Sequence, residues 1–167
     1  MRIEFISRGT LRAFKEGSCA SCDGPHADLL LFGFDGVGEV SYEKELKGES
    51  DFFSDVALLS KGCKNIVVSG CITDTRGIKR KSAVVAEKGK LLGVSDMLHS
   101  IDGKIGCGAT LRMYDTEQGK IGVVVAEDLF FAESVEALAR CGCDFIVCPF
   151  CRLVDSLQSV LIRSYAF

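Results

Sequence analysis

The chain has 167 residues, of which 47% are hydrophobic and 26% charged, and its formal net charge is -3. This profile indicates one globular domain over 1–167 with a sizeable core, and it excludes a disordered chain and a coiled coil. The 20 Lys and Arg residues do not gather into a stripe, and no apolar run approaches the ~20 residues of a spanning helix, so we expect neither a nucleic-acid nor a membrane partner.

Apolar stretches of strand length recur along the chain, with turn-forming residues between them. Short apolar runs bounded by such residues are typical of buried strands. The runs that predict strands are 2–6, 28–34, 65–71, 82–87, 90–94, 119–126 and 144–149. We interpret the basic run Lys79, Arg80 and Lys81 as a solvated turn and not as a nucleic-acid site.

The stretch 51–61, between the second and third predicted strands, predicts a helix. Phe52, Val56 and Leu59 fall on one face at helical spacing, and Gly62 follows as the expected C-terminal cap. We expect this face to pack on the strands.

Two further helices are predicted near the end of the chain. The stretch 132–140 has Glu133 in its first turn and Arg140 in its last, and both charges favour the helix dipole. The stretch 155–165 begins with Asp and Ser, which cap helices, and spaces its apolar residues along one stripe. Strands that alternate with helices in this way predict a layered α/β domain.

Three stretches together resemble the nitrilase, or carbon–nitrogen hydrolase, superfamily. They read DLLLFGF over 28–34, GKLLGVSDMLH over 89–99 and YDTEQGKIGVVVAEDLFFAE over 114–133. The third is the most specific, and the resemblance extends over most of 28–165. It implies an α/β fold of the αββα sandwich type, here in a truncated form, because the family pattern continues beyond residue 167 and a Cys-bearing loop replaces a long helix between residues 6 and 28.

The three positions that carry the family's chemistry are substituted. Phe34 matches the Glu base, Met97 the Lys and Ala126 the Cys nucleophile. Hydrolysis by this route needs a thiolate, a carboxylate and a cation, and these residues supply none of them. The resemblance therefore implies a carbon–nitrogen hydrolase of amidase or nitrilase type that has become a pseudoenzyme. If only one residue of the triad had been lost, the remaining charged residue would be buried without a partner, which is unfavourable. We therefore expect that all three positions form an apolar plug, with the Met97 sulfur near the Phe34 ring.

An active but degenerate amidase that uses other residues is the alternative. The reactive side chains near the matched positions, by comparison with the family, are Asp35, Glu39, Cys71, His99, Glu127 and Asp128. We expect each to be structural. Four of them are candidates for contacts to a small-molecule ligand: Asp35, His99, Glu127 and Asp128.

The nine cysteines suggest a third class of function. Cys148 and Cys151 form a CxxC pair between a predicted strand and a predicted helix, as in thiol redox proteins. With Cys19 and Cys22 they also offer four sulfur ligands for zinc. The odd count and the charged first ten residues instead favour reduced thiols in the core, no metal or other cofactor, and a cytoplasmic location.

Without catalysis, a binding or assembly role is expected. The resemblance implies a homodimer formed through helices, with Val135, Leu138, Ala139 and the last helix facing a second copy. Apolar surface left open by a shortened fold would be buried there.

Overall fold

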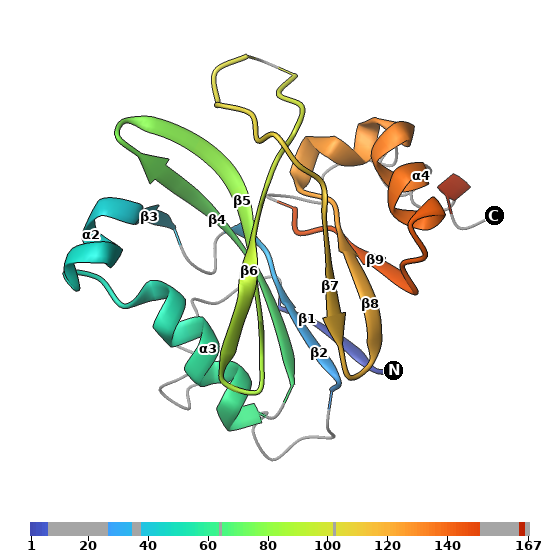
Figure 1. Ribbon diagram of the computed structural model, residues 1–167, viewed down its shortest axis with the longest axis horizontal. Helices are drawn as coiled ribbons and strands as arrows, with labels where there is room; N and C mark the ends of the chain where they lie inside the picture. The colour runs from blue at the N-terminus through green and yellow to red at the C-terminus, as the bar shows by residue number, and fades with distance from the viewer. Residues whose placement is uncertain (7–26, 35–37, 64, 102, 151–163, 166–167) are drawn as a thin grey trace.

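The computed structural model describes residues 1–6, 27–34, 38–63, 65–101, 103–150 and 164–165. Within these ranges the chain forms two β-sheets that lie face to face, with one longer helix on each outer side (Figure 1). None of the described helices is long and apolar enough to cross a membrane.

The larger sheet has the order β1-β2-β4-β5-β6, with β3 pairing to the far end of β4. Its strands are β1 (Ile3–Ile6), β2 (Leu29–Phe32), β3 (Glu39–Ser41), β4 (Ile66–Thr75), β5 (Ile78–Glu87) and β6 (Lys90–Asp96). The first four pair in parallel, and β4, β5 and β6 form two antiparallel hairpins. Both hairpins turn on a residue followed by glycine with positive φ, the geometry that suits the twist of paired strands.

The smaller sheet has the order β7-β8-β9. Its strands are β7 (Arg112–Thr116), β8 (Gly119–Val123) and β9 (Phe145–Val147). β7 and β8 form a hairpin, and β9 adds to β8 in parallel after the chain crosses over through helix α4 (Ala132–Arg140). A short 3-10 helix, η2 (Ala126–Phe130), links β8 to α4.

Two of the described helices, α2 and α3, precede β4 in the chain. The short helix α2 (Tyr42–Lys47) ends at Gly48, whose φ of 70° is left-handed. Helix α3 (Phe52–Cys63) follows, and the Glu45 carboxylate accepts hydrogen bonds from the backbone N–H groups of Phe52 and Phe53 at its first turn. The free N–H groups of that turn are thus satisfied by a side chain from α2.

Three hydrophobic clusters separate the layers. One contains Val56 and Leu59 of α3 with the outer face of the large sheet, one fills the space between the two sheets, and one contains Leu138 of α4 with the outer face of the small sheet. Residues alternate between clusters along each strand, as side chains of a strand alternate between faces. The order of layers is therefore α, β, β, α, which confirms the predicted sandwich.

Most predicted elements are confirmed with small shifts at their ends, and 132–140 is helical over its whole predicted length. The expected cap at Gly62 is wrong, because α3 continues through Cys63. The interpretation of the basic run as a turn is also wrong, because Lys79, Arg80 and Lys81 lie inside β5. The prediction missed α2, β3 and β7. Of the predicted helix 155–165, only residues 164 and 165 lie within the described chain, and both are helical.

Candidate functional site

The structure brings the three substituted positions into one apolar cluster between the sheets. Phe34 follows β2, Met97 follows β6 and Ala126 follows β8, so all three leave strands at the same end of the sandwich. Their exposed fractions are 7%, 1% and 4%. The predicted apolar plug therefore matches the burial of these residues, while the contact between the Met97 sulfur and the Phe34 ring stays a prediction.

Phe34 is held where the chain leaves the sheet between β2 and β3. Both strands pair with β4: β2 ends opposite Ser69 and β3 begins opposite Ile72, so Phe34 follows β2 where the described pairing stops. The Phe34 ring lies directly over Gly70, where an added Cβ would be 2.8 Å from a ring carbon. Gly70 thus makes room for an aromatic side chain at the position of the family's base.

Ala126 has a strained backbone. Its φ is 48°, in the left-handed region that L residues other than glycine rarely adopt. Its N–H donates to the carbonyl oxygen of Pro149 at 3.2 Å, which fixes the turn from β8 into η2. Strain of this kind is characteristic of functional sites and persists only where the surrounding structure enforces it.

A charged pair lies directly beside the plug. Lys81 of β5 donates to Oε1 of Glu127, the residue after Ala126, and the Met97 N–H donates to the Lys81 carbonyl at 2.8 Å. The two side chains are 17% and 26% exposed. The other carboxylate oxygen, Glu127 Oε2, is buried and has no hydrogen-bond partner among the described residues. A Lys and a Glu are therefore present here, but neither lies at a position that matches the Lys or the Glu of the family pattern.

Asp128 and His99 form a second polar group at this end. The buried Asp128 carboxylate accepts the backbone N–H groups of Leu98 and His99 at 2.8 to 3.0 Å and lies 3.0 Å from His99 Nδ1. The imidazole stacks on the Phe131 ring with centroids 4.2 Å apart. Because Asp128 holds the loop after β6 against η2, the structural role expected for Asp128 and His99 accounts for these contacts.

The described thiols near the site are poorly suited to nucleophilic chemistry. Burial, and secondarily the charge of Asp96, raises the pKa of Cys71 to about 12. Burial also raises the pKa of Cys148, whose thiol donates to the Ala126 carbonyl at 3.9 Å. A thiol attacks only as its thiolate, so both are unreactive at neutral pH.

Several predicted residues lie outside the described chain. They are Asp35, Cys19, Cys22 and Cys151, so the structure does not bear on a zinc site or on the CxxC pairs beyond Cys148. The described residues contain no group of three or more possible metal ligands. Glu39, another reactive candidate, is bonded to Lys79 on the surface.

Sequence reasoning missed Lys81, which is the partner of Glu127. The available signal was strand alternation, because Lys81 shares a strand face with Ala83 and Val85 once β5 is extended to Ile78. Gly70 was missed as well, and no local pattern marked it.

Comparison with known proteins relates the sequence to hydrolases. No family model matches the chain. The chain is 31% identical over 123 residues to an omega-amidase of Danio rerio and 26% identical over 122 residues to a hydrolase of Schizosaccharomyces pombe. Each match covers 65% of this chain, but only 43% and 38% of those proteins, so the chain spans about two fifths of the curated relatives that it matches.

Solved structures show the same fold over nearly the whole chain. A Cys-to-Ala variant of a Nesterenkonia amidase from the nitrilase superfamily superposes with a TM-score of 0.77, at 20% identity, over 99% of this chain and 71% of that one. The carbon–nitrogen hydrolase of Helicobacter pylori superposes with a TM-score of 0.74, at 17% identity, over 98% and 68%. In fold and in sequence the chain is therefore similar to members of the nitrilase, or carbon–nitrogen hydrolase, superfamily.

Proposed function

We propose that this chain is a catalytically inactive relative of the carbon–nitrogen hydrolases and acts through binding or assembly. The observation that carries the proposal is the burial of Phe34, Met97 and Ala126 in one apolar cluster. An apolar plug offers neither a nucleophile nor a proton acceptor to a bound amide or nitrile.

Ligand binding by a substituted variant has a precedent in the same fold. A Nesterenkonia amidase variant that combines a Cys-to-Ala and a Glu-to-Gln replacement is known in complex with acrylamide. By the resemblance to the family, the family's Cys and Glu correspond to Ala126 and Phe34 in this chain. The precedent supports a binding role.

A relocated amidase site is the second candidate. Lys81 and Glu127 would have to supply the cation and the base, and a thiol would have to reach the same substrate. The described thiols nearest the site, Cys71 and Cys148, are kept protonated by burial, which raises the pKa of each. This observation favours the inactive protein over the degenerate enzyme and over thiol redox chemistry at Cys148.

The decisive experiment is an ammonia-release assay on the purified chain with simple amides and nitriles. We expect no turnover above buffer, for the wild type and for Cys71→Ala alike. Turnover that co-purifies with the protein and disappears in Cys71→Ala or Glu127→Gln would establish a relocated site. An Ala126→Cys variant labelled with acrylamide serves as a positive control for access to the family's nucleophile position.

Assembly is tested separately, by light scattering coupled to size-exclusion chromatography. Of the helix face expected to meet a second copy, Leu138 is buried against the chain's own β8, whereas Ala139 is exposed and Val135 half-buried. A homodimer that Ala139→Glu dissociates supports assembly, and a monomer at all concentrations supports binding. A cytoplasmic location stays an inference from the cysteines of the sequence.

A further inference from the structure

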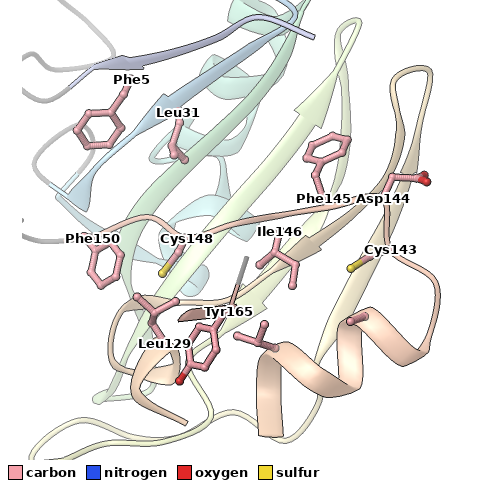
Figure 2. A pocket seen from close by; sticks show the side chains of 12 residues that line it. Phe5, Leu31, Leu129, Cys143, Asp144, Phe145, Ile146, Cys148, Phe150 and Tyr165 are labelled. Carbon is pink, nitrogen blue, oxygen red and sulfur yellow. The ribbon is translucent and has the colours of Figure 1, made fainter. Parts of the chain in front are cut away.

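An apolar cavity of about 690 Å³ lies beside β9 and adjoins the plug of Phe34, Met97 and Ala126. Phe5 of β1 and Leu31 of β2 line it from the large sheet (Figure 2), and Val135 and Ala139 line it from α4. The three plug residues are not among its lining residues, although Cys148, which lines it, donates to the Ala126 carbonyl. The cavity is therefore a neighbour of the plug that shares none of its three residues.

The lining is rich in aromatic rings and poor in charge. Four rings contribute, from Phe5, Phe145, Phe150 and Tyr165. Among the described lining residues there is no Lys, Arg or His, and the one carboxylate, Asp144, uses Oδ2 to accept the Lys120 N–H at 2.7 Å. The other heteroatoms in the described lining side chains are the Tyr165 hydroxyl and the two thiols of Cys143 and Cys148 (Figure 2).

The cavity is open to solvent, since Phe5 is 43% exposed and Ala139 and Asp144 are exposed as well. Apolar surface left in contact with water is unfavourable, and a ligand that covers it removes this area from water. The volume falls in the range of about 300 to 1,000 Å³ typical of ligand pockets.

We propose that this cavity binds a neutral, largely apolar small molecule with an aromatic or branched aliphatic body. The charge of the lining selects the ligand class. The described lining offers an anionic group no cation and places the exposed carboxylate of Asp144 near it, so carboxylates and sulfonates are disfavoured. The proposal goes beyond the loss of catalysis and does not depend on it.

The test compares two fluorescent probes that differ in one charge. N-phenyl-1-naphthylamine is neutral, and 8-anilino-1-naphthalenesulfonate is the same ring system with a sulfonate added. We expect saturable binding of the neutral probe at one per chain, and at least about tenfold weaker binding of the sulfonate, because its charge finds no cation in the described lining and lies near Asp144.

A pair of variants on α4 locates the probe. Ala139 lines the cavity, whereas Ala137 is exposed on the same helix and does not line it. Ala139→Phe should fill part of the cavity and lower the affinity for the neutral probe at least about tenfold, a change of ~1.4 kcal/mol in the binding free energy. Ala137→Phe makes the same chemical change outside the cavity and should leave the affinity unchanged. Circular dichroism confirms that both variants fold.

Alkylation of the wild type gives a second readout that needs no variant. Cys143 lines the cavity, and Cys107 is exposed in the loop between β6 and β7. Saturating neutral probe should slow the modification of Cys143 by iodoacetamide, followed by peptide mass spectrometry, and should leave Cys107 unchanged.

Three results would overturn the proposal. The first is no binding of the neutral probe to the folded chain, including the case in which light scattering shows a second copy covering the cavity. The second is equal affinity for the two probes. The third is full binding to Ala139→Phe without protection of Cys143, which would place the probe elsewhere. A finding of amide hydrolysis would remove the proposed function but would leave this inference intact.

Discussion

The ammonium group of Lys81 donates to the carboxylate of Glu127, and this ion pair joins β5 of the large sheet to the turn that follows β8 of the small one. Its backbone neighbours are Met97 and Ala126, two of the three substituted positions. The end of the sandwich that holds the substituted positions thus combines an apolar cluster with one half-buried ion pair. Because the two charges neutralise each other, the pair is better suited to holding the two sheets together than to chemistry.

Removing one member of this pair should cost more than removing both. Lys81→Met leaves the Glu127 carboxylate half-buried with both oxygens unpartnered, and we expect a loss of about 1 to 3 kcal/mol in the free energy of unfolding. Lys81→Met/Glu127→Leu should recover most of it. Urea denaturation measures the free energy of unfolding of the single and the double variant. Lys88→Met, in the exposed pair with Glu117, is the matched control and should cost under about 1 kcal/mol. A double variant less stable than the single one would contradict this account.

The contact between Gly70 and the Phe34 ring predicts a specific coupling. Gly70→Ala should destabilise the chain by about 1 to 3 kcal/mol, because the new Cβ would overlap the ring. In a Phe34→Leu background the same change should cost clearly less. Gly62→Ala in α3, where an added Cβ meets nothing within 4 Å, should be neutral or stabilising. Thermal and urea unfolding of the four-member cycle provide the test, and strict additivity would refute the contact.

The backbone of Ala126 predicts an unusual response to glycine. Ala126→Gly relieves the left-handed φ, which offsets the lost methyl contacts, so stability should change by less than about 1 kcal/mol. Ala83 is buried in the same cluster within β5, and Ala83→Gly should cost about 1 to 2 kcal/mol. Equal losses in the two variants, measured by urea unfolding, would show that position 126 is unstrained.

The buried thiols predict a loss of stability at alkaline pH. Burial raises the pKa of Cys71 to about 12 from an ordinary value of 9.0, so the folded state holds its proton more tightly than the unfolded state. The resulting stabilisation is fully present below pH 9 and is lost as the pH rises from 9 towards 12. Cys148 and Tyr114, whose pKa values are also raised by burial, act in the same direction.

Cys71→Ala separates this effect from general alkaline damage. The variant should be less stable than the wild type at pH 8, because a small cavity is created, and the gap should narrow by up to ~1.4 kcal/mol per pH unit above pH 9. Cys107→Ala, which changes an exposed residue, is the control, and its stability should depend on pH as that of the wild type does. A gap that stays constant from pH 8 to 11 would show that Cys71 does not resist ionisation in the fold.

The sequence determined most of the layers and the identity of the substituted positions. Hydrophobic periodicity located α3, because a helix that buries one face must repeat its apolar residues every three or four positions. The charges of Glu133 and Arg140 at opposite ends located α4. The resemblance of 28–34, 89–99 and 114–133 to one superfamily picked out Phe34, Met97 and Ala126, since the order of these stretches is a property of the chain itself. Short elements such as β3 and β7 escaped, because pairing with a distant strand stabilises them and their local pattern does not.

Only the tertiary structure decided what surrounds those positions. The sequence suggested that Lys81 is part of a basic turn, but strand pairing turns it inward beside Met97, where it forms an ion pair with Glu127 of η2. The ring of Phe34 fits because Gly70, distant in sequence, has no side chain. The cavity beside β9 arises from two sheets and a helix together. Such features depend on distances between residues that are far apart in the chain. Local propensity and residue spacing do not determine those distances.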